Sequence, residues 1–129
     1  MKNLNFSIGI LSWKGYASLY NSLKSYEENG LNSLTHSKFI CLPEYNNEGI
    51  KICKNFGYKP ILFKKNIGIL NGFKNLALNM PEGPLLLLEN DLPLVANYKI
   101  THTLLKQSLE HLYKYKAAQV RLRSIKDPG

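Results

Sequence analysis

Two carboxylates, Glu89 and Asp91, stand two residues apart where a run of four leucines ends. Carboxylate oxygens are ligands suited to Mg²⁺ or Mn²⁺, ions that keep several waters and complete their coordination with substrate phosphates. Two acids cannot enclose such an ion alone, so a nucleotide diphosphate would share the site, with the metal as a Lewis acid on the departing diphosphate. The spacing therefore predicts a metal and diphosphate site around Glu89, Asn90 and Asp91. The alternative is an ordinary solvated turn that Pro93 stops.

Aromatic and polar side chains follow two other apolar segments. Ser12, Trp13 and Lys14 come directly after the first segment, and Glu44 follows the second. A nucleobase can stack on the face of Trp13, an interaction worth roughly 1–3 kcal/mol in single-strand binders. Glu44 can accept hydrogen bonds from the edge of a base, because an ionised carboxylate is only an acceptor. The alternatives are that Trp13 anchors the core and that Glu44 is merely solvated.

A third polar segment contains Asn66 and Gly68 and leads into an apolar, helix-like stretch. Gly68 permits close backbone approach, and the first amides of a helix can face an anion. Asn75, with two nearby lysines, can flank the same cleft, although a purely structural turn with solvated lysines explains the segment equally well. No catalytic base is visible, since the three histidines lack both metal-ligand spacing and a nucleophile partner; we interpret them as surface or helix residues (His36, His102, His111).

Alternating β-favouring and helical patterns must position these residues. The patterns predict strands at 6–11, 38–42, 59–63, 85–88 and 118–122 and helices at 16–28, about 47–56, about 69–79 and about 100–113. Such βα alternation predicts an α/β fold, a three-layer α/β/α sandwich with a mostly parallel sheet. The uninterrupted leucine run indicates a strand covered on both faces. In such a sheet the loops after the strands converge on a ligand at one edge.

Composition limits the class of protein. The 129 residues, 44% of them hydrophobic, suit a single domain spanning 1–129. Lys and Arg outnumber Asp and Glu by 17 to 9, giving a net charge of +8 that favours polyanions, phosphorylated ligands or an anionic membrane surface without choosing among them. The two cysteines match neither a zinc-binding nor a secreted pattern, and no apolar stretch is long enough to span a membrane. We therefore expect a cytoplasmic protein with no transmembrane segment.

The order of these motifs resembles the amino-terminal, nucleotide-sugar-binding half of a GT-A glycosyltransferase of the family 2 group, over residues 6 to about 123. Three segments match: 11–14 at the end of the first strand, Asn66-Ile67-Gly68 followed by Asn75, and Glu89-Asn90-Asp91 in place of the Asp-x-Asp motif. The resemblance implies that Trp13 and Glu44 line the base pocket, that Asp91 is the metal ligand and that Glu89 lies near the ribose or the metal. The implied nucleotide-sugar contacts are Ser12, Trp13, Glu44, Asn66, Gly68, Asn75, Glu89 and Asn90.

Several positions depart from the family pattern. Glu replaces the first Asp of the acidic motif, Trp-Lys replaces Tyr-Asn after the first strand, and Glu44 replaces an Asp. Residues 120–124 resemble the strand after which the family places its acceptor-binding region and catalytic base, and that region is missing from these 129 residues. The final Lys-Asp-Pro-Gly turn also indicates a chain that leads onward. We therefore expect a truncated or split transferase, or one component of a longer enzyme.

The expected activity is that of a metal-dependent, hexosyltransferase-like enzyme. It would bind a UDP- or GDP-type sugar with Mn²⁺ or Mg²⁺ and transfer the sugar to a hydroxyl acceptor such as a glycan or a protein. Whether this short chain transfers by itself is left open. One alternative is a non-catalytic nucleotide-binding module. Another is a basic RNA-binding α/β domain, but the lysines are scattered rather than gathered in a basic arm, so no nucleic-acid partner is expected.

Overall fold

The computed structural model describes residues 4–114. Its elements follow one another as β1 (Ser7–Leu11), α1 (Tyr16–Glu28), the 3₁₀ turn η1 (Leu31–Ser33), β2 (Lys38–Pro43), α2 (Asn47–Asn55), β3 (Lys59–Phe63), α3 (Gly68–Asn79), β4 (Leu85–Glu89) and α4 (Tyr98–Lys114). The strands and helices predicted within this range are all present. The strand predicted at 118–122 lies outside the described residues.

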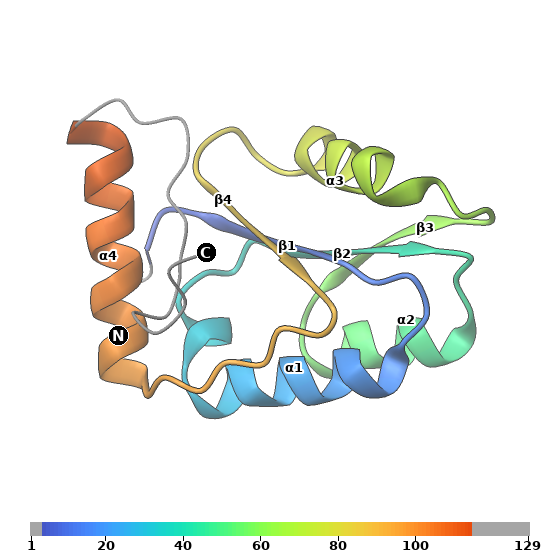
Figure 1. The fold of residues 1–129 in the computed structure, drawn as a ribbon, viewed down its shortest axis with the longest axis horizontal. Helices are drawn as coiled ribbons and strands as arrows, with labels where there is room; N and C mark the ends of the chain where they lie inside the picture. The colour runs from blue at the N-terminus through green and yellow to red at the C-terminus, as the bar shows by residue number, and fades with distance from the viewer. Residues whose placement is uncertain (1–3, 115–129) are drawn as a thin grey trace.

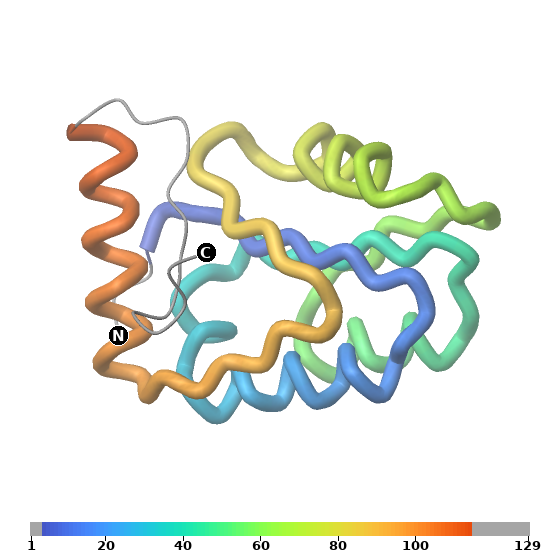
Figure 2. Tube along the Cα trace, viewed as in Figure 1, coloured from blue at the N-terminus to red at the C-terminus, as the bar shows by residue number. Residues whose placement is uncertain are grey.

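The four strands form one parallel sheet in the order β3-β2-β1-β4. Helices α1 and α2 cover one face of this sheet and α3 covers the other, as Figure 1 and the trace in Figure 2 show. The chain is therefore an α/β protein with the predicted three-layer sandwich. In the part of the chain that is described, no helix is long and apolar enough to cross a membrane.

The alternation of side chains along the central strand β1 divides the core in two. Ile8 and Ile10 are fully buried against the α1 side, where Leu19 and Leu23 pack on them. Leu11 points to the other side and packs with Leu76 of α3. A Cβ atom on Gly72 would lie 2.5 Å from Leu11 Cδ1, so glycine lets α3 approach the end of β1 closely.

The leucine run is less covered than its composition indicates. Within residues 4–114, β4 pairs only with β1, which makes it an edge strand of the described sheet. Leu86 and Leu88 pack against the α1-side core, but Leu87, on the opposite face, is 41% exposed. The prediction of a strand buried on both faces is therefore wrong for this part of the chain, because α3 packs mainly on β1 and β2.

Helix boundaries agree with the sequence patterns, but helix burial agrees only in part. Asn46 is the N-cap of α2, and its side chain accepts a hydrogen bond from the Gly49 amide at 3.1 Å. Tyr20 belongs to the apolar stripe of α1 but lies at the rim, where its ring meets Phe56 edge-on. Helical spacing identifies the apolar side of a helix, whereas the neighbouring elements decide how much of that side is buried. The residues of the apolar helical patterns that are exposed are Tyr20, Ala77, Ile100, Leu104 and Tyr113.

We predict that Gly30 is the glycine whose replacement most disturbs the seating of α4. Gly30 has a φ of +80°, and a Cβ atom there would overlap the ring of Tyr98 at the start of α4. Gly30→Ala should lower the free energy of unfolding by about 2–4 kcal/mol in urea titrations, combining the left-handed backbone cost with overpacking.

Gly57→Ala is the matched control, because Gly57 has a φ of +73° and only Lys38 Nζ, at 3.9 Å, near a new Cβ. It should cost only about 1–2 kcal/mol, the backbone part alone. Equal losses in the two variants would show that the Tyr98 contact does not matter.

Candidate functional site

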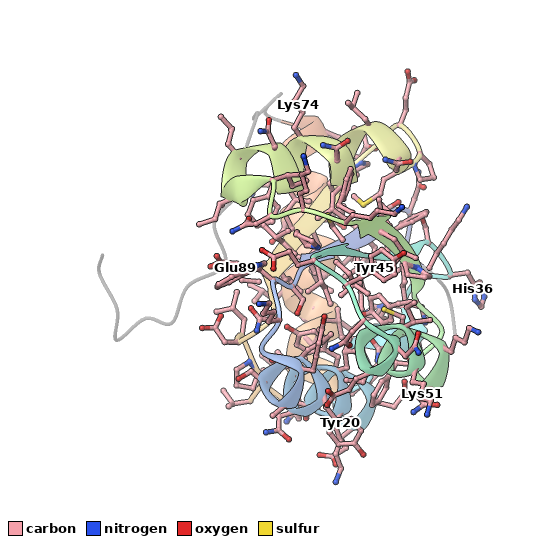
Figure 3. All side chains as sticks on the ribbon, turned by 90° about the vertical axis from the view of Figure 1, so that its right-hand side faces the viewer. Tyr20, His36, Tyr45, Lys51, Lys74 and Glu89 are labelled. Carbon is pink, nitrogen blue, oxygen red and sulfur yellow. The ribbon has the colours of Figure 1, made fainter. Side chains whose placement is uncertain are left out.

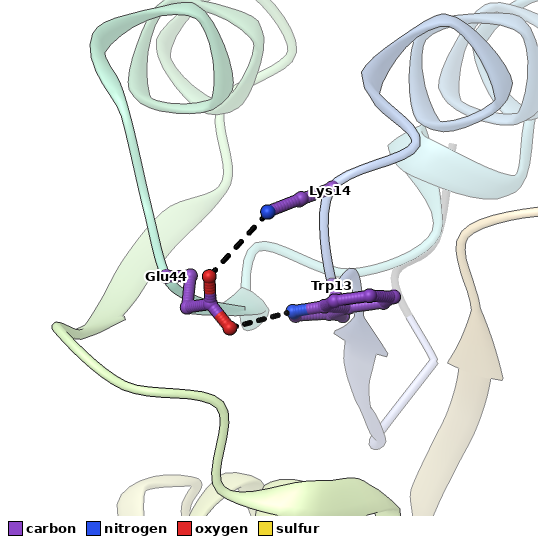
Figure 4. Close-up of polar contacts among 3 residues, drawn as sticks. All are labelled: Trp13, Lys14 and Glu44. Atoms are coloured by element: carbon purple, nitrogen blue, oxygen red, sulfur yellow. Dashed lines mark hydrogen bonds and ion pairs between the residues drawn. The ribbon is translucent and has the colours of Figure 1, made fainter.

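The loops that follow β1 and β2 meet through three side chains. Trp13 Nε1 donates a hydrogen bond to Glu44 Oε1 at 3.3 Å, and Lys14 Nζ lies 3.4 Å from Glu44 Oε2 (Figure 4). Trp13 is 51% exposed, so it is a loop residue with an accessible ring rather than a core anchor. The ion pair is itself solvent-exposed and contributes about 0–1 kcal/mol to stability. What it contributes is a link between the loops that follow the neighbouring strands β1 and β2.

Both charged residues of this pair have an unusual backbone conformation. Lys14 has a φ of 54° and Glu44 a φ of 47°, and within residues 4–114 they are the non-glycine residues with positive φ. Such a conformation costs about 1–2 kcal/mol per residue. Buried Ser12 helps to hold it: Ser12 Oγ donates to the Lys14 carbonyl at 2.9 Å, and the Ser12 amide donates to the Cys41 carbonyl at 3.0 Å. Backbone strain of this kind gathers at functional sites.

The end of β4 lies beside the same loop. Glu89 is in register with Leu11, and Asn90 Nδ2 donates to the Gly15 carbonyl at 3.3 Å. A Cβ atom on Gly15 would lie 2.5 Å from Asn90 Nδ2, so a larger residue would push the two segments apart. The acidic segment and the Trp13 loop therefore lie at one edge of the sheet, as predicted from the parallel topology.

The two carboxylates of the acidic segment leave the strand in different directions. Strand alternation places Glu89 on the α3 side of the sheet with Leu11. Asp91 follows a turn at Asn90 and approaches α1: burial raises the pKa of Tyr26 to about 12, and the charge of Asp91 adds to this rise. Both acids are exposed, and neither has a hydrogen-bond or ion-pair partner within residues 4–114. Their oxygens are thus available to a cation.

Ligands for a metal ion are few at this edge. Over the described range, no group of three or more His, Cys, Asp or Glu side chains is arranged to hold a metal. Because Glu89 and Asp91 leave the end of β4 in different directions, each offers a separate carboxylate to a cation whose coordination is completed by water and phosphate oxygens. They do not fit a closed structural site such as that of zinc.

The segment from Asn66 into α3 forms the turn expected from its sequence. Asn66 Oδ1 accepts from the Gly68 amide at 2.9 Å, and Gly68 has a φ of +78° with open space around it. Asn75 lies almost two turns further along α3, and its amide donates to the Asn71 carbonyl at 2.8 Å. No hydrogen bond joins Asn66, Gly68 or Asn75 to the Trp13 loop within residues 4–114. The structure therefore gives Asn75 a partner in its own helix.

A set of hydrogen bonds that sequence reasoning missed fixes the path of the chain after β4. Buried Ser22 donates to the Asn90 carbonyl at 2.8 Å, and Tyr26 donates to the Leu92 carbonyl at 2.5 Å. Ser25, one turn after Ser22, accepts through Oγ from the Leu94 amide at 2.8 Å. We call residues 90–94 the α1 strap. Its only signal in the sequence is polar residues beside the apolar stripe of α1, a pattern that solvent exposure also explains.

Other candidate catalytic groups lie elsewhere. His36 precedes β2, and His102 lies on α4 with His111. The cysteines are free and buried, and burial raises the pKa of the Cys41 thiol to about 11, so that it stays protonated at neutral pH. Comparison with protein-family models, with curated proteins and with solved structures finds no match for this chain.

We predict that the hydrogen bond from Ser22 of α1 to the Asn90 carbonyl stabilises the acidic segment. Ser22→Ala should lower the free energy of unfolding by about 1–2 kcal/mol, since it leaves the Asn90 carbonyl without its partner. Amide hydrogen exchange in residues 89–94 should become faster. The control is Ser108→Ala, which removes a hydroxyl that donates to the Leu104 carbonyl on exposed α4. Equal stability losses, or unchanged exchange in the α1 strap, would contradict this role.

We also predict that Tyr26, which donates to the α1 strap, makes the free energy of unfolding sensitive to alkaline pH. Burial raises the pKa of Tyr26 from 10.0 to about 12, so the folded state keeps its proton where the unfolded chain has lost it. This stabilisation is complete below pH 10 and is lost between about pH 10 and 12, at up to about 1.4 kcal/mol per pH unit. In urea titrations at pH 9, 10 and 11, Tyr26→Phe should show the smaller decline. Equal declines in the free energy of unfolding of the unmodified chain and of Tyr26→Phe would rule out Tyr26 as the titrating group.

Proposed function

We propose that the chain is the nucleotide-sugar-binding domain of a metal-dependent glycosyltransferase. One observation carries the proposal: an exposed tryptophan, a strained carboxylate beside it and a pair of exposed acids follow three adjacent parallel strands at one edge. In open α/β sheets, ligands bind in the crevice beyond the carboxyl ends of the strands. A flat ring next to acids indicates a ligand that contains both a base and a metal-bound diphosphate.

The Trp13 and Glu44 pair supports the base-binding part of this proposal. Glu44 accepts from the Trp13 indole and faces Lys14, yet a carboxylate offers about four acceptor sites, so an N–H group on a base edge can still be accepted. The hydrogen bond to Glu44 fixes the orientation of the indole. Lys14 Nζ lies over the indole ring, 5.3 Å from its centroid, so a base would stack on the other face, and the ammonium group is at the base end of such a ligand.

Asp91 and Glu89 support the diphosphate part. Asp91 would hold Mn²⁺ or Mg²⁺ with Glu89 near the ribose or the metal, and the bound ion would stabilise the departing diphosphate. Asn90 holds the segment against Gly15, and Ser22 holds it against α1. The Gly68 amide is taken by Asn66 Oδ1, but the open space around Gly68 would let a phosphate oxygen approach the amides that follow in the first turn of α3. Asn75 belongs to the proposal only through its place in the sequence motif.

The acceptor is proposed to be a hydroxyl group of a glycan or a protein. The described residues supply donor-binding groups, whereas the base that would deprotonate the acceptor is not assigned to any residue of this chain. Donor binding and sugar transfer are therefore separate questions. A nucleotide-binding module without transferase activity shares every donor contact, and only a transfer assay separates the two.

We predict that a nucleoside diphosphate and Mn²⁺ together stabilise the folded chain. At a ligand concentration about 100 times Kd, mass action adds about 2.7 kcal/mol, a shift of several degrees in Tm. The measurement is thermal unfolding with UDP or GDP, each with and without Mn²⁺. Asp91→Asn should remove the part of the shift that depends on Mn²⁺, and Glu44→Gln should reduce the shift with or without metal.

Glu82→Gln is the matched control, because Glu82 is an exposed acid in the turn before β4, at the opposite end of that strand. It should respond to ligand like the unmodified chain. No shift with any nucleotide would refute the proposed function. A normal shift without release of sugar from UDP- or GDP-sugars, in the presence or absence of acceptors, would favour the binding module.

A further inference from the structure

The outer face of α3 carries an apolar stripe that no element within residues 4–114 covers. Leu70, Lys74 and Leu78 recur at four-residue steps, so they lie on the same side of the helix. Leu70 is 82% exposed and Leu78 72% exposed, whereas Gly72 and Leu76 face the sheet. Figure 3 shows Lys74 on the outside of α3, pointing away from the sheet. We call these three residues the α3 stripe.

The charges near the α3 stripe are mainly positive. Residues 64–81 contain Lys64, Lys65 and Lys74 and no acidic residue, and Glu82 follows in the turn after α3. Ile69, in the first turn of α3, adds a further apolar side chain that is 64% exposed. On α3 itself the one charged side chain among these exposed apolar residues is Lys74, and such a mixture fits a surface that is itself part apolar and part anionic.

We propose that this face of α3 docks onto the surface of an anionic phospholipid bilayer. Leu70 and Leu78 would enter the boundary between headgroups and acyl chains. Lys74 would lay its aliphatic stem along the same boundary and keep its ammonium group at the phosphates. Each lysine close to an anionic leaflet contributes about 1 kcal/mol, and binding by a few side chains is reversible. This proposal does not depend on the proposed glycosyltransferase function.

The dimensions of the α3 stripe favour a bilayer over a protein partner. From Leu70 to Leu78 the helix rises about 12 Å, and the three side chains of the α3 stripe form a narrow line. Stable protein interfaces bury about 800 Å² on each partner, and lysine is depleted from them. A bilayer requires no complementary shape, and its phosphates complement the lysines. Charge and size therefore point to the same partner.

The test is co-sedimentation of the full chain with vesicles of phosphatidylcholine alone or mixed with about 30% phosphatidylglycerol. We expect binding to the anionic vesicles that weakens as salt is raised. Leu70→Glu should weaken it about tenfold or more. The control is Val95→Glu, the same change of charge at a 95% exposed apolar residue in the segment that runs along α1, across the sheet from α3 (Figure 1).

A second pair of variants separates position from overall charge. Lys74→Glu should weaken vesicle binding, whereas Lys51→Glu, on exposed α2 at the other side of the molecule, should weaken it much less (Figure 3). Absence of binding to anionic vesicles by the unmodified chain, or equal losses within either pair, would overturn the proposal. Self-association that Leu70→Glu abolishes, without vesicle binding, would instead assign the α3 stripe to a second copy of the chain. Circular dichroism verifies that each variant is folded.

Discussion

Parallel pairing on both sides of β1 is the constraint on which the rest of the structure depends. Leu11, the last residue of β1, is in register with Cys41 of β2 and with Glu89 of β4. Because all three strands run the same way, the residues that follow them emerge at one edge. Trp13, Glu44 and Asn90 are 31 to 77 positions apart in sequence, yet this register makes their loops neighbours. Reversal of any one strand would move its loop to the opposite edge.

The strand ends are held in place by contacts that differ in kind. The Trp13 loop depends on local geometry: buried Ser12 bonds to the Lys14 carbonyl and supports a left-handed backbone. The acidic segment depends on tertiary contacts, because the α1 strap ties it to Ser22 and Tyr26. Strain in one loop and anchorage of the other both reduce the freedom of side chains that would meet a ligand. Such restriction lowers the entropy lost on binding.

The sequence predicted the features that local patterns determine. Apolar runs and helical spacing located β1 to β4 and α1 to α4, and the exposure of Trp13 decides against the alternative that it anchors the core. Features that depend on distant neighbours were missed: the exposure of Leu87 reflects where α3 lies, and the direction of Asp91 reflects hydrogen bonds from α1. Periodicity indicates which side of an element is apolar, but the amount of cover is set by tertiary packing. The strand predicted at 118–122 lies outside the described residues.

Helix α3 links the two proposals, because its inner face packs on the sheet near the proposed donor site and its outer face is the one proposed to meet a bilayer. Gly72 brings the inner face against Leu11 at the end of β1, so the first turn of α3 lies at the same edge as the Trp13 loop. The outer face presents Leu70, Lys74 and Leu78. A bilayer in contact with that outer face would lie next to the edge where the donor is proposed to bind. If both proposals hold, a hydroxyl acceptor at the membrane surface would reach the donor without diffusing through bulk water. The lysines close to α3 would then matter more for membrane binding than the total net charge of +8.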